Sequence, residues 1–277
     1  MAAEVGSDLA AAFTSAVFVA PVVAAVDKAI TESSAGRANI FASFTATMKG
    51  FLDPRALRRP EFLYAWALFA GTYTINNLVC SAEQHKKTSL AAVKTSGVFA
   101  GNMSLAMWKD AAFARIFGGA TAAALPPKSY GAWAVRDLTG MSVVFTLPPL
   151  LAPKLAAATE MNLRSAETFL QFTLPMAIQP VVAPFHQLGF LFSFKPDAPL
   201  SSHWSTVKAQ VGGVVVMRWI RGFPPYCVGA TMNKNLRYEF RDALGLSNDS
   251  VAAPEPLARA VTKPGDSLAL ARTMTPG

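Results

Sequence analysis

The sequence predicts an all-α membrane protein in which six transmembrane helices form three tandem helix pairs, with short interfacial helices. Hydrophobic residues make up 52% of the 277 residues, and charged residues make up only 15%, against about 25% in ordinary globular chains. Apolar stretches long enough to cross a bilayer recur along the chain. Too few charges remain to cover the surface of a soluble domain of this length.

The predicted membrane domain occupies residues 1–245 and divides into helix pairs at about 8–84, 88–158 and 162–245. Residues 246–277 are rich in proline, alanine and serine, so we expect a disordered tail there.

The first helix pair contains the clearest membrane spans. No charge interrupts the segment Leu9–Val26, which as a helix would cross about 27 Å. Pro21 lies inside it, a placement that membranes tolerate where neighbouring helices satisfy the freed carbonyl. Apolar residues then recur every three or four positions over 40–52, which is typical of a helix lying on an interface. The second span, Phe62–Cys80, is again uncharged.

Charges interrupt the middle pair. The segment Leu90–Phe117 contains Lys109 and Asp110, so it can span only if these charges are neutralised or face water. A loop rich in glycine, alanine and proline leads to Tyr130–Ala158, of which about 20 residues can span.

Prolines mark the third pair. Thr168–Phe194 is the longest apolar run, and its three prolines predict a kinked helix. The sixth span, Val211–Val228, carries Arg218 and Arg221 one helical turn apart.

An internal repeat supports the grouping into pairs. The segment Ala20–Lys28, APVVAAVDK, recurs almost unchanged as Gln179–Gln187, QPVVAPFHQ. Residues 104–110 fit the same frame. The three frames place a polar residue at matching helix ends: Asp27, Asp110 and His186.

Three tandem pairs, a proline partway along the odd helices with a charge after it, and an interfacial helix after the first span together resemble the mitochondrial carrier family. The resemblance covers about residues 8–245 and lies in the architecture. The odd-helix signature of that family is Pro-x-Asp/Glu-x-x-Lys/Arg, whereas here Pro21 stands six residues before Asp27 and His186 replaces an acid. Residues 110–118 and 125–137, with FARIFG at 113–118 and AVRD at 134–137, are also similar to uncharacterised carrier-like mitochondrial proteins of fungi and algae.

The resemblance implies a multi-pass protein of a mitochondrial membrane, most simply the inner one, that exchanges a small anionic metabolite by alternating access. It also implies a gate or inter-repeat network, for which the sequence offers Pro21, Asp27, Lys28, Lys109, Asp110, Pro180, His186, Glu83, Lys86 and Glu239. The alternative is a carrier-shaped accessory subunit of a mitochondrial membrane complex that does not transport.

Charged residues within the apolar segments are the main candidates for substrate binding. A charge at membrane depth costs at least about 2.5–3.5 kcal/mol unless it is paired or hydrated. Arginines lining a water-filled cavity would bind carboxylate or phosphate through their fork-shaped donors; alternatively they form structural ion pairs or reach the headgroups. The candidates are Arg136, Asp137, Arg218, Arg221, Asn76 and Asn77.

No sequence feature predicts an enzyme, a metal site or a cofactor. The histidines His85, His186 and His203 lie in different segments without cysteine or carboxylate at metal-ligand spacing. A membrane enzyme would require His186 to meet Asp137 or Glu167 in one pocket.

The net charge of +8 does not point to nucleic acid, because the basic residues stand singly or in short clusters without RNA-binding aromatic motifs. The expected partners are the lipid bilayer, a small anionic solute and, under the alternative hypothesis, other subunits of a membrane complex.

Overall fold

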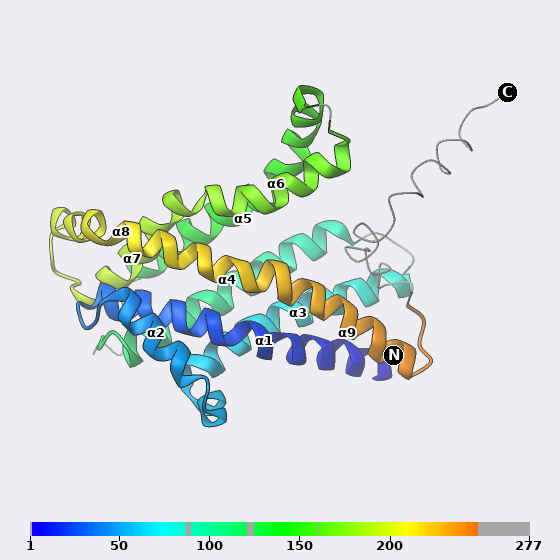
Figure 1. Cartoon of the computed structure of the whole chain (residues 1–277), viewed down its shortest axis with the longest axis horizontal. Helices are drawn as coiled ribbons and strands as arrows, with labels where there is room; N and C mark the ends of the chain where they lie inside the picture. The colour runs from blue at the N-terminus through cyan, green and yellow to red at the C-terminus, as the bar shows by residue number, and fades with distance from the viewer. Residues whose placement is uncertain (1, 87–89, 121–124, 160, 249–277) are drawn as a thin grey trace.

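The structure is a computed structural model that describes residues 2–86, 90–120, 125–159 and 161–248. These residues form helices joined by short turns, with no strand among them (Figure 1). The predicted disordered tail lies outside the described residues from 249 onward. In chain order the elements are α1 (Ala2–Ser34), α2 (Ile40–Gly50), the 3-10 helix η1 (Pro54–Arg58), α3 (Pro60–Lys86), α4 (Ala91–Ile116), α5 (Pro127–Thr159), α6 (Leu163–Ala177), α7 (Gln179–Phe194), α8 (Leu200–Phe223), the π-helix η2 (Pro224–Gly229) and α9 (Ala230–Ala243).

Helix α1 is the central element of the bundle. It packs along α3 and also contacts α2, α8, α9 and η2. The face that it turns to α3 consists of small residues, which lets the two backbones approach closely. Fully buried residues on this face are Ala12, Ala16, Val19, Ala20, Val23 and Ala24, against Phe62, Ala65, Leu68 and Phe69 of α3.

Among the described residues, α1 alone combines the length and the apolar composition of a membrane span, with a mean hydropathy of 2.2 over its best window. The other long helices are long enough to cross a bilayer but carry more polar or charged residues. The six spans and the three-pair arrangement therefore stay predictions.

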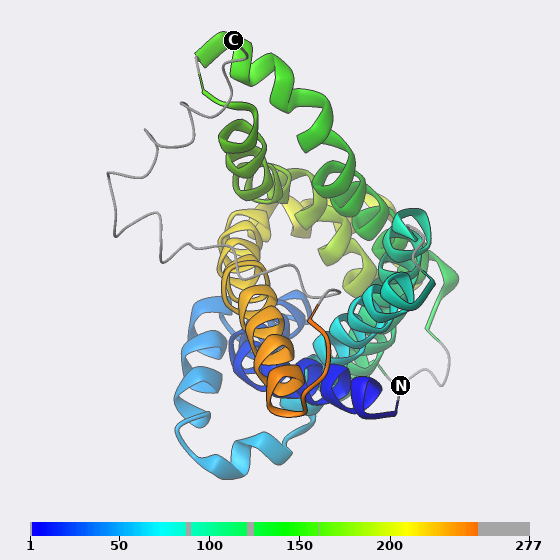
Figure 2. The same cartoon turned by 90° about the vertical axis from the view of Figure 1, so that its right-hand side faces the viewer.

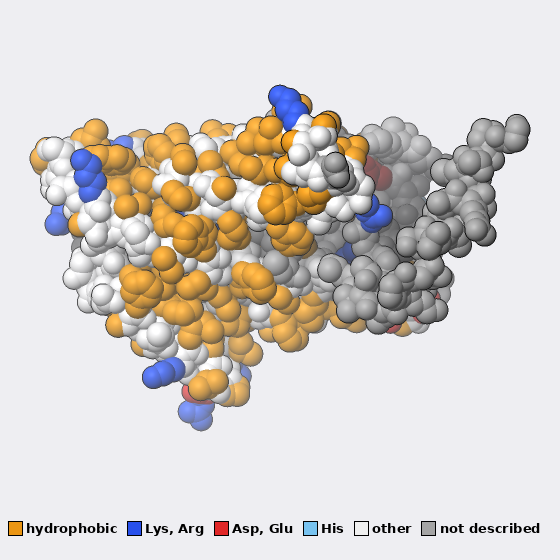
Figure 3. Space-filling model, turned by 45° about the horizontal axis from the view of Figure 1, so that its top comes forward, with side chains coloured by type: hydrophobic (Ala, Val, Ile, Leu, Met, Phe, Trp, Pro, Cys, Tyr) orange, Lys and Arg blue, Asp and Glu red, His pale blue; other side chains and the backbone are white. Residues whose placement is uncertain are grey.

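Hydrophobic side chains cover much of the face shown in Figure 3, whereas lysines and arginines gather at its edges. Large apolar side chains are exposed on several helices, which suits contact with lipid tails better than contact with water. They include Phe13, Phe18, Phe169, Phe172, Trp219 and Phe223.

The longest apolar run is two helices, not the single kinked helix that the prolines predict. Helix α6 ends and α7 begins at Ile178, whose backbone caps both. Pro180 stands in the first turn of α7, where its missing N–H costs no helical hydrogen bond. A second irregularity follows α8, where Pro224 begins the π-helical turn η2. A separate helix, α2, follows the first predicted span, and its position at a membrane interface stays a prediction.

Gly189 permits the tight packing of α5 against α7. A Cβ at this position would lie 2.1 Å from Nε1 of Trp133, a fully buried indole. We therefore expect Gly189→Ala to lower the free energy of unfolding by about 1–3 kcal/mol, because the packed indole has to move. A melting curve of the detergent-purified protein measures this change.

Gly131 on α5 is the matched control, since a Cβ there meets nothing within 4 Å. Gly131→Ala should be neutral or stabilising by up to about 1 kcal/mol. Equal melting temperatures for the two variants would contradict the packing role of Gly189.

Candidate functional site

A layer of buried ion pairs lies where α1, α4, α5, α7 and α8 meet. Lys109 of α4 places its Nζ 2.8 Å from Oδ2 of Asp27 on α1, and it also pairs with the neighbouring Asp110. All three side chains are at most 1% exposed. Removing one member of such a group would leave an uncompensated buried charge, so the pairs hold α1 and α4 together.

Asp110 is the centre of this layer. Its Oδ2 accepts from Nη1 of Arg136 on α5 and lies 3.7 Å from Nε2 of His186 on α7. Arg136 in turn forms a two-bond fork with Asp137, at 2.7 Å and 2.8 Å. This planar, bidentate geometry is the strongest form of an arginine–carboxylate pair.

Helix α8 contributes two arginines with different partners. Arg221 donates from Nε to Oδ1 of Asp27 at 2.9 Å. Arg218 donates from Nε to the amide oxygen of Gln179 at 2.7 Å, and its Nη1 lies 2.9 Å from Nδ1 of His186. Within the described part of the chain, Arg218 has no carboxylate partner.

Helical spacing directs these side chains into one space. On α7, Gln179, Val182 and His186 follow one another at intervals of three and four residues, which places them on one face. Arg218 and Arg221 are likewise three residues apart on α8. In Figure 2, α8 and α4 lie on opposite sides of the bundle, so the layer bridges them.

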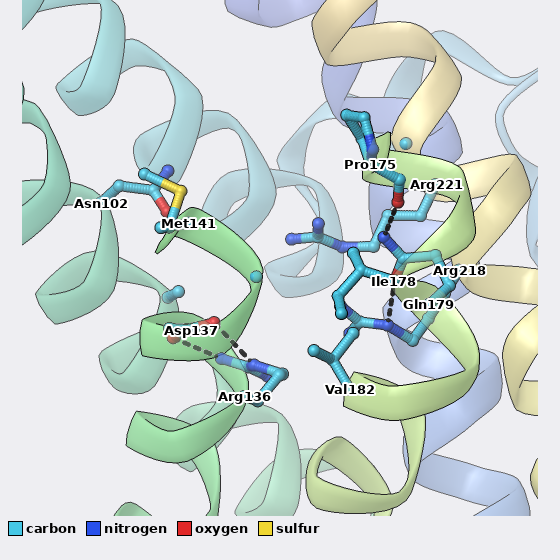
Figure 4. A pocket seen from close by; sticks show the side chains of 13 residues that line it. Asn102, Arg136, Asp137, Met141, Pro175, Ile178, Gln179, Val182, Arg218 and Arg221 are labelled. Carbon is cyan, nitrogen blue, oxygen red and sulfur yellow. Dashed lines mark hydrogen bonds and ion pairs between the residues drawn. The ribbon is translucent and has the colours of Figure 1, made fainter. Parts of the chain in front are cut away.

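A cavity lies against this layer, between α4, α5, α6, α7 and α8 (Figure 4). It contains about 690 Å³ of empty space, including the part open to solvent. The lining is formed by Asn102, Ala106, Arg136, Asp137, Gly140, Met141, Pro175, Ile178, Gln179, Val182, Arg218, Arg221 and Gly222.

The cavity lies on one side of the ion-pair layer. On α4 its lining residues Asn102 and Ala106 precede Lys109, and on α5 Gly140 and Met141 follow Arg136. The other side of the layer is occupied by a packed apolar core. Its members include Ile30, Phe113, Trp133 and Phe190, and the rings of the last two lie 5.4 Å apart. The cavity thus ends at the layer.

The model of the probable citrulline exporter family matches residues 11–241. The chain belongs to this family. The match contains every residue of the ion-pair layer and of the cavity lining. The chain matches no curated protein and no solved structure.

Membership in a citrulline exporter family corrects part of the sequence interpretation. The family is a transporter family, which supports a membrane protein associated with transport. It is not the mitochondrial carrier family, which the architecture resembles. The resemblance was misleading because it depended on predicted helix pairs and repeated prolines, which are not specific to the carrier family. The sequence signatures that are specific to that family are incomplete in this chain.

The structure places the repeat-related residues Asp27, Asp110 and His186 in the same layer. It also brings Arg136, Asp137, Arg218 and Arg221 to the same layer and to the cavity. The two interpretations of these charges coexist, because Arg136 and Arg221 form ion pairs and also line the cavity. Pro21 stays inside the uninterrupted helix α1.

Other predicted network members lie elsewhere. Lys28 pairs with Glu61 of α3 at 3.3 Å, because it is one residue beyond Asp27 and faces away from the layer. Glu83 accepts from the backbone N–H of Leu90, and Glu239 is exposed on α9. The side chain of Lys86 lies outside the described part of the structure.

The predicted binding residues Asn76 and Asn77 do not line the cavity. Asn77 exchanges two hydrogen bonds with Asn233 of α9, at 3.0 Å and 2.8 Å, and it also donates to the backbone oxygen of Asp8. Asn76 contacts Asn77. These amides join helices, which is the ordinary role of polar side chains within apolar bundles.

Sequence reasoning missed a second buried charge cluster, formed by Asp8, Ser81, Arg237 and Arg241. Asp8 is fully buried and accepts from Nε of Arg237 at 2.6 Å and from Nη2 of Arg241 at 3.2 Å. Both arginines also donate to the hydroxyl of Ser81. The sequence did contain a signal for this cluster. Arg237 and Arg241 are four residues apart and so lie on one face of a helix, and Asp8 is the acid at the start of the apolar run of α1.

The arrangement that a membrane enzyme would need is not formed in the described residues. His186 contacts Asp110 and Arg218, whereas Glu167 accepts from Gln171 on its own helix. No group of three or more metal-ligating side chains occurs in the described ranges.

Proposed function

We propose that this chain exports citrulline, or a closely related small amino acid, across a mitochondrial membrane by alternating access. The family description supplies the substrate and the direction. The mitochondrial location and the alternating access are carried over from the sequence interpretation as parts of the proposal. Citrulline has a carboxylate, which is the anionic group that the arginines predict. Its α-ammonium group balances that charge, so the substrate has no net negative charge.

The observation that carries the proposal is a polar cavity that ends at a layer of ion pairs. A transporter with alternating access needs a binding site that is reached from one side while the other side is closed. Here the cavity holds the polar groups, the ion pairs form its end, and the apolar core behind them excludes water.

The ion pairs are suited to be the groups that separate during export. Asp27–Lys109 connects α1 with α4, Arg221–Asp27 connects α8 with α1, and Arg136–Asp110 connects α5 with α4. Opening the closed side requires these helices to part, and water then replaces the lost partners. The break at Ile178 gives α7 a flexible point beside the cavity.

Efflux of radiolabelled citrulline from liposomes that contain the purified protein tests this function. We expect efflux above that of protein-free liposomes. Gly140→Phe should reduce the rate at least about tenfold, because Gly140 lines the cavity, a Cβ there meets nothing within 4 Å, and the ring beyond it would fill the space.

The matched control is Gly131→Phe, nine residues earlier on α5, where a Cβ also meets nothing within 4 Å and the residue does not line the cavity. It should export like the unmodified protein. A chain that moves no citrulline or related amino acid, and that co-purifies with a stable complex, would be an accessory subunit instead.

A further inference from the structure

Arg218 is the one cation of the layer that forms no direct ion pair with a carboxylate among the described residues. Lys109 contacts two aspartates, Arg136 contacts two, and Arg221 contacts one. Among the described residues, the polar partners of Arg218 are the amide of Gln179 and the ring of His186.

A guanidinium has five N–H donors, and only two of those of Arg218 have partners among the described residues. The residue also lines the cavity. A half-buried arginine with spare donors that face a cavity matches the geometry of a carboxylate ligand, which accepts two parallel hydrogen bonds.

The opposite wall of the cavity presents a carboxylate. In Figure 4, Arg136 and Asp137 lie on one side of the space, and Gln179 and Arg218 lie on the other. The side chain of Asp137 is 16% exposed, against at most 1% for the other two aspartates of the layer. Each of its oxygens accepts one bond from Arg136 and keeps a lone pair for a further donor.

The charges of the layer limit what else a ligand can carry. Its members are four cations, Lys109, Arg136, Arg218 and Arg221, and three anions, Asp27, Asp110 and Asp137. A second positive charge on the ligand would therefore add repulsion in a partly dehydrated space. A neutral side chain that can hydrogen-bond avoids this, and Asn102 offers its amide oxygen, since its nitrogen already donates to Thr72.

We propose that the cavity is a zwitterion site in which Arg218 binds the α-carboxylate of an amino acid and Asp137 binds its α-ammonium group. Gln179 positions the guanidinium of Arg218, and Arg136 positions the carboxylate of Asp137. The site selects neutral side chains over cationic ones. This assignment rests on the proposed function and names the contacts that would give it specificity.

Binding of radiolabelled citrulline to the detergent-purified protein tests the carboxylate pole. Arg218→Gln should weaken binding at least about 30-fold, since it removes one partner of a desolvated charge pair. Arg218→Lys should recover part of the loss, because it restores the charge without the fork. Arg58→Gln, on the exposed surface of η1, should leave affinity unchanged.

The ratio of the affinities for two ligands tests the ammonium pole, because this ratio does not depend on the fraction of the protein that is correctly folded. The unmodified protein should prefer citrulline over 5-ureidopentanoate, which lacks only the α-ammonium group, by about tenfold or more. In Asp137→Asn this preference should fall towards one. Arginine should bind the unmodified protein more weakly than citrulline.

The two levels of the proposal fail in different ways. If the unmodified protein binds and exports no citrulline or related amino acid, the proposed function is wrong and the site assignment falls with it. Suppose instead that the unmodified protein exports citrulline. The zwitterion site alone would then be overturned by any one of three results: Arg218→Gln binds citrulline as tightly as the unmodified protein, Asp137→Asn keeps the preference for citrulline over 5-ureidopentanoate, or the unmodified protein binds arginine more tightly than citrulline.

Discussion

Replacing Asp110 with alanine is expected to lower the free energy of unfolding by about 3–5 kcal/mol and to abolish export. Asp110 contacts Lys109, Arg136 and His186, so its removal leaves two cations facing each other in a space that excludes water. For a chain of this size the loss corresponds to a fall in melting temperature of roughly 6–20 °C. Thermal unfolding of the purified protein measures it.

Asp242→Ala is the matched control, because Asp242 is exposed on α9. Its effect should stay within about 0.5 kcal/mol. The conservative variant Asp110→Asn keeps the size of the side chain and removes only the charge. If Asp110→Asn melted like the unmodified protein, the layer would not depend on the carboxylate charge, and the ion pairs could not serve as the closing contacts.

The convergence of Asp27, Asp110 and His186 could be predicted because it follows from two sequence facts. Each stands at the matching position of an internal repeat, and a charge inside an apolar helix requires a partner. The arginines of the fifth and eighth helices supply these partners. Repeat position and the energetics of burial single out these three residues, but the predicted network also contained Lys28, Glu83 and Glu239, which lie elsewhere.

The identity of each pair depends on helical phase and on distant packing. Lys28 adjoins Asp27 just as Lys109 adjoins Asp110, yet Lys28 turns towards Glu61 while Lys109 enters the layer. The rotation of α1 and α4 decides this difference, and the local sequence does not fix it. Three prolines likewise allow a break anywhere in the long apolar run, and the packing of α7 on α5 and α8 places it at Ile178.

The second cluster was out of reach for a related reason. Asp8 and Arg241 are separated by most of the chain, and their contact arises because α9 folds back along α1. Asp8 and Asp27 bound the uncharged run of α1, and 19 residues of helix separate them by about 28 Å, close to the thickness of the hydrocarbon core. Helix α1 is thus held by arginines at both ends of its apolar segment.

Asp8→Ala is expected to destabilise the protein by about 3–5 kcal/mol, because it removes a fully buried carboxylate that contacts Arg237 and Arg241. Citrulline affinity should change little, since the cluster does not line the cavity. Asp197→Ala, in the exposed turn before α8, is the control and should be neutral within about 0.5 kcal/mol.

A double-mutant cycle separates the pair from the individual residues. Asp8→Ala combined with Arg241→Ala should cost less than the sum of the two single variants, by about 0.5–3 kcal/mol, because residues in one buried network are coupled. Additive losses would show that the two side chains stabilise the fold independently. A large fall in citrulline affinity in Asp8→Ala alone would instead connect the Asp8 cluster to the binding site, although Asp8 does not line the cavity.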